Sequence, residues 1–294
     1  MNIGFVTQYS ENVVEFAGRT GFKCLELFTE YDTALNLDQM TDEKIEEINS
    51  IFEKNGVRIG TICCSVNHLD GDPVQRKRNN EYFKKAIRLC KTFGASIVTS
   101  NAWADKSRTP LENIPVFKEV FTEYAELAEQ EGVKIAIENC PHSIGYPMPI
   151  GNIAFSPEMW EALFEAVPSK AVGLEFDPSH LYWQGIDYVK AIRDFGDRIY
   201  AFHAKDTEIV KDMQSRCGIL GKQFGKASDW DAGWWRYRIP GWGMIDWLGV
   251  FKALYDIKFS GPMVIEHEDP VFDGELREQG LAMGLRYLQQ FFIE

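Results

Sequence analysis

The sequence predicts an α/β protein, a (β/α)8 TIM barrel, because short apolar runs alternate with longer amphipathic segments from end to end. The runs predict strands at 3–7, 23–28, 57–63, 95–100, 133–138, 171–177, 198–203 and 262–266. The amphipathic segments predict helices near 11–20, 41–55, 75–93, 113–131, 156–166, 184–195, 245–257 and 275–292. Eight parallel strands are the number that closes into a barrel. No G-x-G-x-x-G follows any strand, which disfavours an open dinucleotide-binding sheet.

Local signals agree with these boundaries. Thr41 and Ser156 each precede an acidic first turn and are predicted helix N-caps. Gly94 and Gly132 are predicted to close the helices that precede them. No linker, repeat or low-complexity tract interrupts the chain, so residues 1–294 are predicted to form one domain. The connection after the seventh strand, 207–243, is far longer than the others and is rich in tryptophan.

Composition narrows the class of protein. The formal net charge of −13 disfavours a nucleic-acid partner, because phosphate binding requires a basic surface. No apolar run approaches the length needed to span a membrane, and no leader is expected, since the N-terminus enters a strand at once. The six cysteines include no CxxC pair, which favours a reducing, cytoplasmic setting.

Four acidic or imidazole side chains end the last four predicted strands: Glu138, Asp177, His203 and Glu266. The C-terminal ends of barrel strands open onto one mouth, so these side chains are expected to meet there. Singly, each could be a capping, salt-bridging or core residue. Together they predict a site for one divalent metal ion, with Mn²⁺ preferred and Mg²⁺, Co²⁺ or Zn²⁺ as alternatives.

Such a site suits chemistry at a hydroxy-ketone. A bound ion polarises the carbonyl and acidifies the adjacent C–H, and Glu138 and Glu266 are predicted to remove and return the proton through an enediolate. His180, three residues after Asp177, is a candidate hydrogen-bond donor to substrate or a further group around the metal. Lys205 is a candidate partner for a substrate hydroxyl or the developing oxyanion.

At these residues the chain resembles the xylose-isomerase-like TIM-barrel superfamily, in its sugar (phosphate) isomerase and epimerase branch. The superfamily has a metal-binding glutamate at the end of strand five, which matches Glu138. Its Asp-x-x-His after strand six matches Asp177 and His180. The resemblance covers the whole chain in fold pattern and is specific in motif only in the second half.

The strand-seven histidine of the superfamily, commonly followed by Lys-Asp, matches His203 with Lys205, and its strand-eight glutamate matches Glu266. In epimerases similar to D-tagatose 3-epimerase, both glutamates bind the metal and act as the acid–base pair. The resemblance therefore implies this double role for Glu138 and Glu266. Inosose dehydratase belongs to the same superfamily, and its enediolate instead expels a leaving group, so a dehydratase or lyase acting on a keto-sugar or inosose remains the alternative.

The endonuclease IV branch of the superfamily uses three metals and further histidines on strands three and four. The matching stretches here, 63–65 and 99–101, contain no histidine. A phosphodiesterase is therefore disfavoured. A non-catalytic sugar-binding barrel is disfavoured as well, because a binder has no need of two glutamates around a metal.

The long connection supplies candidate substrate contacts. Tryptophan faces suit the apolar face of a sugar, and arginines suit its oxygens or an attached phosphate or carboxylate. The predicted pocket residues are Trp234, Arg236, Arg238 and Trp242. The alternative is that they form packing or homo-oligomer contacts. The expected partner in either case is a small sugar or cyclitol.

Overall fold

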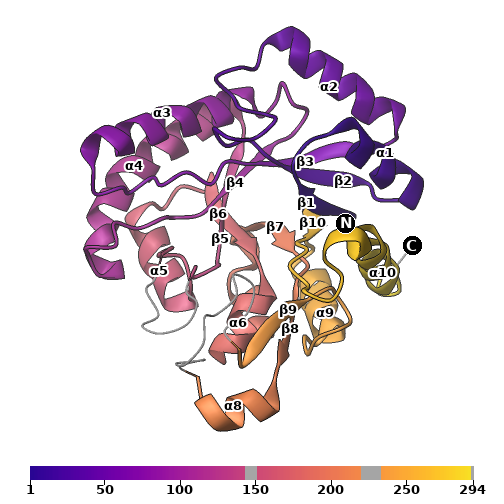
Figure 1. Cartoon of the computed structure of the whole chain (residues 1–294). Coiled ribbons are helices and arrows are strands. Elements are labelled where there is room, and N and C mark those ends of the chain that lie inside the picture. The colour runs from indigo at the N-terminus through magenta and orange to yellow at the C-terminus, as the bar shows by residue number, and fades with distance from the viewer. Residues whose placement is uncertain (143–150, 220–232, 293–294) are drawn as a thin grey trace.

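The computed structural model describes residues 1–142, 151–219 and 233–292. Its centre is a closed barrel of eight parallel strands, which confirms the predicted fold class (Figure 1). The strands are β1 (Asn2–Thr7), β2 (Cys24–Phe28), β3 (Arg58–Cys63), β4 (Ile97–Ser100), β5 (Lys134–Glu138), β6 (Val172–Phe176), β7 (Ile199–His203) and β10 (Pro262–Ile265). The barrel closes where β1 pairs with β10, with Phe5 opposite Ile265.

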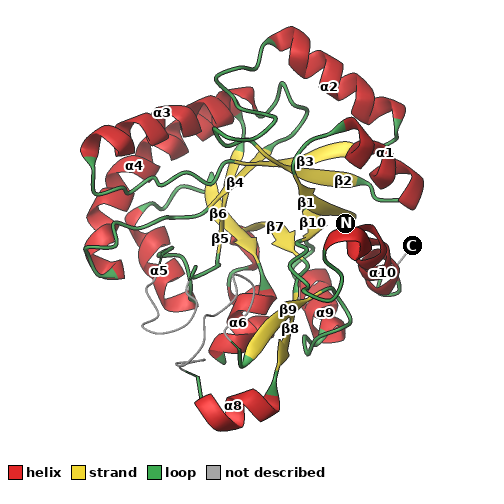
Figure 2. Ribbon diagram, in the orientation of Figure 1, coloured by secondary structure: helices red, strands yellow, loops and turns green. Residues whose placement is uncertain are grey.

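Helices surround the strands in an outer layer, as Figure 2 shows. They are α1 (Glu11–Thr20), α2 (Asp42–Lys54), α3 (Pro73–Leu89), α4 (Pro110–Glu131), α5 (Pro157–Ala166), α6 (Pro178–Gln184), α7 (Tyr188–Asp194), α9 (Trp247–Asp256) and α10 (Arg277–Gln289). Apolar side chains fill the space between the two layers. Phe5, for example, lies 4.8 Å from Phe22 and 5.8 Å from Phe16, measured between ring centroids. No helix within the described ranges is long and apolar enough to cross a membrane.

Most of the predicted helix ends are confirmed. Thr41 and Ser156 each accept a hydrogen bond from the backbone N–H three residues on. Gly132 ends α4 with φ at 63°, a left-handed conformation that glycine adopts without strain. The prediction for Gly94 is displaced, because α3 ends at Leu89 and Gly94, with φ at 75°, lies in the turn that follows.

The predicted helix 184–195 is wrong in its extent. Two short helices, α6 and α7, occupy this region, and α6 begins directly after β6. Asp177 is the N-cap of α6 and accepts a hydrogen bond from Ser179 N, while Pro178 occupies the first helical position. Gly185, with φ at 77°, ends α6. Pro-Ser-His after β6 therefore starts a helix at the barrel mouth.

The connection after β7 contains regular secondary structure. It contains β8 (Asp206–Ile209), α8 (Lys211–Cys217) and β9 (Trp235–Arg238), and β8 and β9 pair as an antiparallel hairpin with Thr207 opposite Tyr237. Figure 1 shows this hairpin beside α6, outside the barrel. Residues 220–232 of the predicted excursion lie outside the described residues.

His68 is a fully buried histidine whose pKa burial lowers to about 3. Its Nδ1 lies 3.2 Å from the hydroxyl of Tyr124 and its Nε2 lies 2.8 Å from that of Ser100. The unfolded chain binds a proton at His68 near the ordinary value of 6.5, whereas the folded chain does not. The unfolding free energy is therefore expected to decrease as the pH is lowered from about 6 toward 3. This residue contributes a decrease of about 1.4 kcal/mol per pH unit.

The variant His68→Gln tests this expectation. Unfolding free energies of the wild type and the variant, measured by urea denaturation across pH 4–7, should converge as the pH falls. Parallel pH profiles would contradict a neutral, buried His68.

Candidate active site

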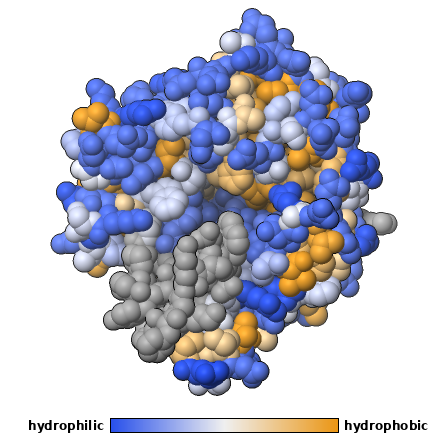
Figure 3. Space-filling view, in the orientation of Figure 1, coloured by the Kyte–Doolittle hydropathy of each residue, from blue (hydrophilic) through white to orange (hydrophobic). Residues whose placement is uncertain are grey.

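The carboxyl ends of the barrel strands surround a hollow in one face of the molecule, where hydrophilic side chains gather (Figure 3). Beneath it lies a cavity of about 140 Å³. Three carboxylates on its wall come from β2, β5 and β6, and two further groups come from β7 and the residue after β10. These are Glu26, Glu138, Glu175, His203 and Glu266. Parallel strands thus bring residues far apart in sequence into one acidic cavity.

Glu138, the last residue of β5, contacts both histidines of the mouth. Its Oε1 lies 3.2 Å from Nε2 of His180 and 3.4 Å from Nδ1 of His203. Its Oε2 accepts a hydrogen bond of 3.0 Å from the amide of Asn101. Burial by itself would raise the pKa of Glu138, but the two imidazoles hold that pKa well below its ordinary value. Glu138 is therefore an ionised base at neutral pH.

Glu266 follows β10 and contacts the same imidazole. Its Oε2 lies 3.1 Å from Nδ1 of His203 and 2.5 Å from Nζ of Lys205. Burial opposes ionisation here too, yet the Lys205 ammonium lowers the pKa of Glu266. Glu138 and Glu266 are thus two carboxylates that meet at one nitrogen atom, each with a different second partner.

Asp177 and His180 lie one helical turn apart at the start of α6. Oδ2 of Asp177 is 3.2 Å from Nε2 of His180 and 3.3 Å from Nζ of Lys205. Nδ1 of His180 lies 2.8 Å from the hydroxyl of Tyr237, which β9 places above the mouth. Tyr237 therefore fixes the ring so that Nε2 faces the carboxylates of Asp177 and Glu138.

Lys205 is buried among acids. Besides Glu266, its Nζ contacts Oε2 of Glu268 at 2.9 Å, and it lies 4.3 Å from the ring centroid of Tyr237. Burial raises the pKa of Glu268 to about 8, although the Lys205 charge opposes that shift. The mouth therefore holds, besides Glu138, Asp177 and Glu266, a fourth carboxyl group, Glu268, that keeps its proton at neutral pH.

The residues present fit a divalent cation. Ligand atoms of Glu138, Asp177, His180 and Glu266 all lie within 4.8 Å of one another. Oδ2 of Asp177 is buried, and its contacts with His180 and Lys205 do not have the geometry of a hydrogen bond in the described part of the chain. Three carboxylates and an imidazole are the donors that a hard or borderline divalent ion takes. A bound cation would offset the repulsion among these anions.

His203, predicted as a metal ligand, contacts carboxyl groups through both of its ring nitrogens. Its Nδ1 faces Glu138 and Glu266, whereas its Nε2 belongs to a second group of possible ligand atoms with Glu26 and Glu175. Glu138, Asp177 and Glu266 of the predicted quartet thus form one group of possible ligand atoms with His180, whereas His203 contacts Glu138 and Glu266 from β7. The assignment of His203, and not His180, as the imidazole that binds the ion stays a prediction.

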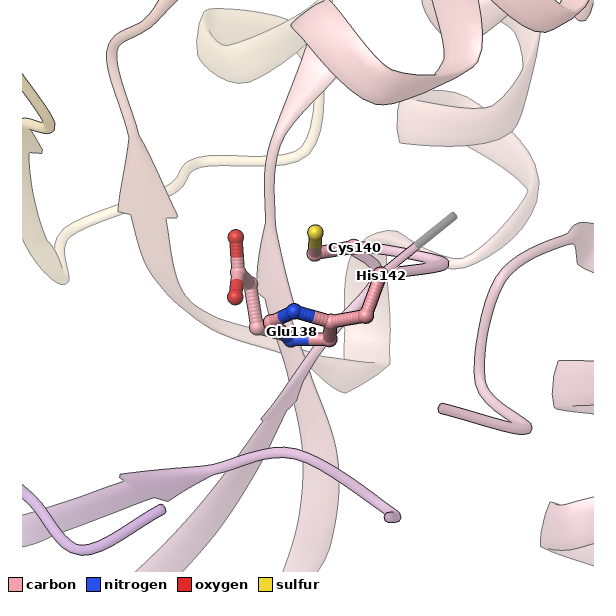
Figure 4. Close-up of side chains that lie close together, drawn as sticks. All are labelled: Glu138, Cys140 and His142. Atoms are coloured by element: carbon pink, nitrogen blue, oxygen red, sulfur yellow. The ribbon is translucent and has the colours of Figure 1, made fainter. Parts of the chain in front are cut away.

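A third group lies at the edge of the mouth, where Glu138, Cys140 and His142 come close together (Figure 4). The ring of His142 stacks on Trp103 with a centroid separation of 4.0 Å. Burial would raise the pKa of Cys140, but His180 and His142 lower it to about 7. The spacing Glu-x-Cys-x-His directly after β5 is the signal in the sequence for this group.

The four predicted pocket residues of the long connection lie in other surroundings. Trp234 is buried with Trp183 and Trp235, and Trp242 packs against Phe272. Arg236 and Arg238 both bind Glu208. None of the four lines the cavity that Glu138 and Glu266 share, as far as the described residues define it. Their contact with substrate stays a prediction.

Arg238 also forms a buried ion pair whose contribution to the unfolding free energy can be measured. Its Nε donates to Oδ2 of Asp269 at 2.9 Å, and both side chains are buried. Arg238→Ala is expected to reduce the unfolding free energy by about 3–5 kcal/mol, because it leaves a buried carboxylate without its cationic partner. Arg236→Ala, which breaks a more exposed pair, is the matched control with about 0–1 kcal/mol.

Denaturant unfolding of both variants checks this difference. Equal stability of the two would contradict a structural role of the Arg238–Asp269 pair. Kinetics of a folded Arg238→Ala variant at saturating metal would show separately whether KM rises, as the pocket prediction requires.

Comparison with known proteins identifies the family of this chain. The model of the family described as xylose isomerase-like TIM barrel matches residues 14–291, and the chain belongs to that family. The uncharacterized protein YfiH of Bacillus subtilis (strain 168) is 28% identical over 95% of this chain and 94% of its own length. Inosose isomerase of the same organism is 28% identical over 63% of this chain and 58% of its own length.

Among solved structures, the IOLI protein with a bound zinc atom superposes with a TM-score of 0.76 at 21% identity, over the full length of both chains. At that identity the likeness shows the fold alone. Other similar proteins are named as a D-psicose 3-epimerase and an inosose dehydratase. The named relatives are thus isomerases, epimerases and dehydratases of sugars and cyclitols.

Proposed function

We propose that this protein is a metal-dependent isomerase or epimerase that acts on a sugar or cyclitol ketone through an enediolate. The observation that carries the proposal is the meeting of Glu138 and Glu266 at Nδ1 of His203, at 3.4 Å and 3.1 Å, on the wall of one cavity. Two ionised carboxylates that approach a substrate carbon from different strands can remove a proton on one side and return it on the other.

Four residues would hold the ion: Glu138, Asp177, His203 and Glu266. Mn²⁺ is the preferred ion, and Mg²⁺, Co²⁺ and Zn²⁺ are alternatives. A bound ion supplies polarisation of the substrate carbonyl, which acidifies the neighbouring C–H. Oδ2 of Asp177, which is buried without a well-aligned hydrogen bond in the described part of the chain, supports this donor set.

The chain's own groups do the remaining work. Either glutamate takes the proton as a carboxylate, since both pKa values lie below the ordinary range. Lys205, 2.5 Å from Glu266, donates a hydrogen bond to the oxygen on which charge develops. Tyr237 holds His180 with Nε2 toward the mouth, where it can hydrogen-bond a substrate hydroxyl.

A dehydratase acting on a keto-sugar or inosose is the second candidate. The observation that favours it is Glu268, whose raised pKa of about 8 keeps a proton available beside Lys205 and Glu266. That proton could pass to a hydroxyl leaving from the enediolate. Relatives named inosose dehydratase support the same reading.

Product analysis separates the two. The Mn²⁺-loaded protein is incubated with 3-keto-glycosides and inososes, and the products are identified by mass spectrometry and NMR. The proposal expects a product of unchanged mass, an isomer or epimer, whereas a dehydratase gives a product lighter by one water. Absence of both products across the panel would contradict the proposed class.

A further inference from the structure

His203 lies between the mouth of the barrel and a second acidic layer beneath it. Its Nδ1 faces Glu138 and Glu266 in the mouth. Its Nε2 points the other way, 3.2 Å from Oε1 of Glu175 and 3.6 Å from Oε1 of Glu26. The imidazole thus separates two pairs of carboxyl groups.

Glu26 and Glu175 form this second acidic layer, and hydrogen bonds fix the position of Glu26. Oε2 of Glu26 accepts a hydrogen bond of 2.6 Å from Thr61, and its Oε1 accepts one of 2.9 Å from Thr99. Both oxygens of Glu26 are therefore already occupied. Glu175 lies opposite Glu138 in the pairing of β6 with β5, so it stands directly beside a predicted metal ligand. Glu26, Glu175 and His203 are all buried.

Two buried polar atoms in this layer have no hydrogen-bond partner by strict geometry within the described residues: Oε1 of Glu175 and Nε2 of His203. They are also each other's neighbours at 3.2 Å. A small rotation of either side chain would join them. Leaving both unpaired in a buried site would cost free energy, since neither can bind water freely.

Metal binding specifies which nitrogen carries the proton. An imidazole that gives its Nδ1 lone pair to an ion must carry the hydrogen on Nε2, and that N–H needs a buried acceptor. We infer that Glu175, backed by Glu26, is a positioning residue that accepts the Nε2–H of His203 and holds Nδ1 toward the metal-binding mouth. The inference rests on the metal site of the proposed function and extends it to a residue that does not touch the ion.

The experiment measures Mn²⁺ affinity by competition with a chelator in the wild type, Glu175→Met and Glu175→Gln. Methionine has a similar length but accepts hydrogen bonds only weakly, so Glu175→Met is expected to bind Mn²⁺ about 10–100-fold more weakly. Glutamine retains an acceptor oxygen and should remain within a few-fold of the wild type. Tyr124→Phe, which removes a buried hydroxyl next to His68, is the control for general loss of stability and should keep wild-type affinity.

A second measurement needs no variant. In the Zn²⁺-loaded wild type, ¹⁵N NMR of His203 should show a metal-bound Nδ1 and a protonated Nε2. Metal bound through Nε2 would overturn the inference, as would wild-type affinity in folded Glu175→Met.

The number of ions bound per chain distinguishes the remaining outcomes. Two ions in the wild type, with one lost in Glu175→Met, would make the second acidic layer a cation site and overturn the positioning role. A wild type that binds no ion would overturn both the inference and the proposed function, whereas failure of the Glu175 variants alone leaves the proposed function standing.

Discussion

Glu266→Gln is expected to lower kcat by about 10²–10⁴-fold at saturating Mn²⁺, while KM changes little. Glutamine preserves the shape of the side chain and can still contact Lys205 and His203, but it cannot accept or return a proton at neutral pH. The loss therefore falls on the chemical step. Steady-state kinetics on the substrate found by product analysis, with metal content measured in parallel, gives both quantities.

Two controls make this result specific. Glu138→Gln should lose turnover to a similar extent, because both carboxylates are needed in a two-sided proton transfer. Glu278→Gln, a change in an exposed surface pair with Arg19, should leave kcat unaffected. Near-normal turnover in Glu266→Gln with metal bound would remove Glu266 from the acid–base pair.

His203→Ala is expected to abolish stoichiometric metal binding, from about one ion per chain in the wild type to a small fraction of that. Nδ1 of His203 is the nitrogen that both glutamates approach, so its loss removes a ligand and leaves their charges facing each other. Elemental analysis after dialysis against Mn²⁺ or Zn²⁺ measures the content.

His68→Gln is the matched control, since it removes another buried histidine away from the mouth. It should retain the ion. If His203→Ala bound as much metal as the wild type, the ligand assignment would fail, and His180, which lies within reach of Asp177 and Glu138, would take the place of His203.

The barrel was predictable from sequence because each buried parallel strand is a short apolar run, and the length of the run together with its flanking turn residues distinguishes it from a helix. The mouth residues were predictable for a related reason: a charged group directly after such a run must lie at the strand's carboxyl end. Glu138 and Glu266 are examples. Glu175 carried the same kind of signal, since it precedes Asp177 by two and alternation places both on one side of the strand.

Other features depend on contacts between distant segments. Tyr237 contacts His180 only because β9 pairs with β8, and no local sequence pattern predicts that hairpin. Asn101 binds Glu138 through the adjacency of β4 and β5. The arginines were assigned to substrate from composition, whereas their observed partners, Glu208 and Asp269, are fixed by tertiary packing.

The measurement that tests the central claim most directly is isotope transfer during turnover in deuterated water. If the reaction passes through an enediolate formed by Glu138 and Glu266, the product carries solvent deuterium at the carbon next to the carbonyl. The same reaction with substrate deuterated at that carbon should lose its label to solvent. Full retention of the substrate's deuterium at the accepting carbon, with no label from solvent, would indicate a hydride shift and contradict the proposed mechanism.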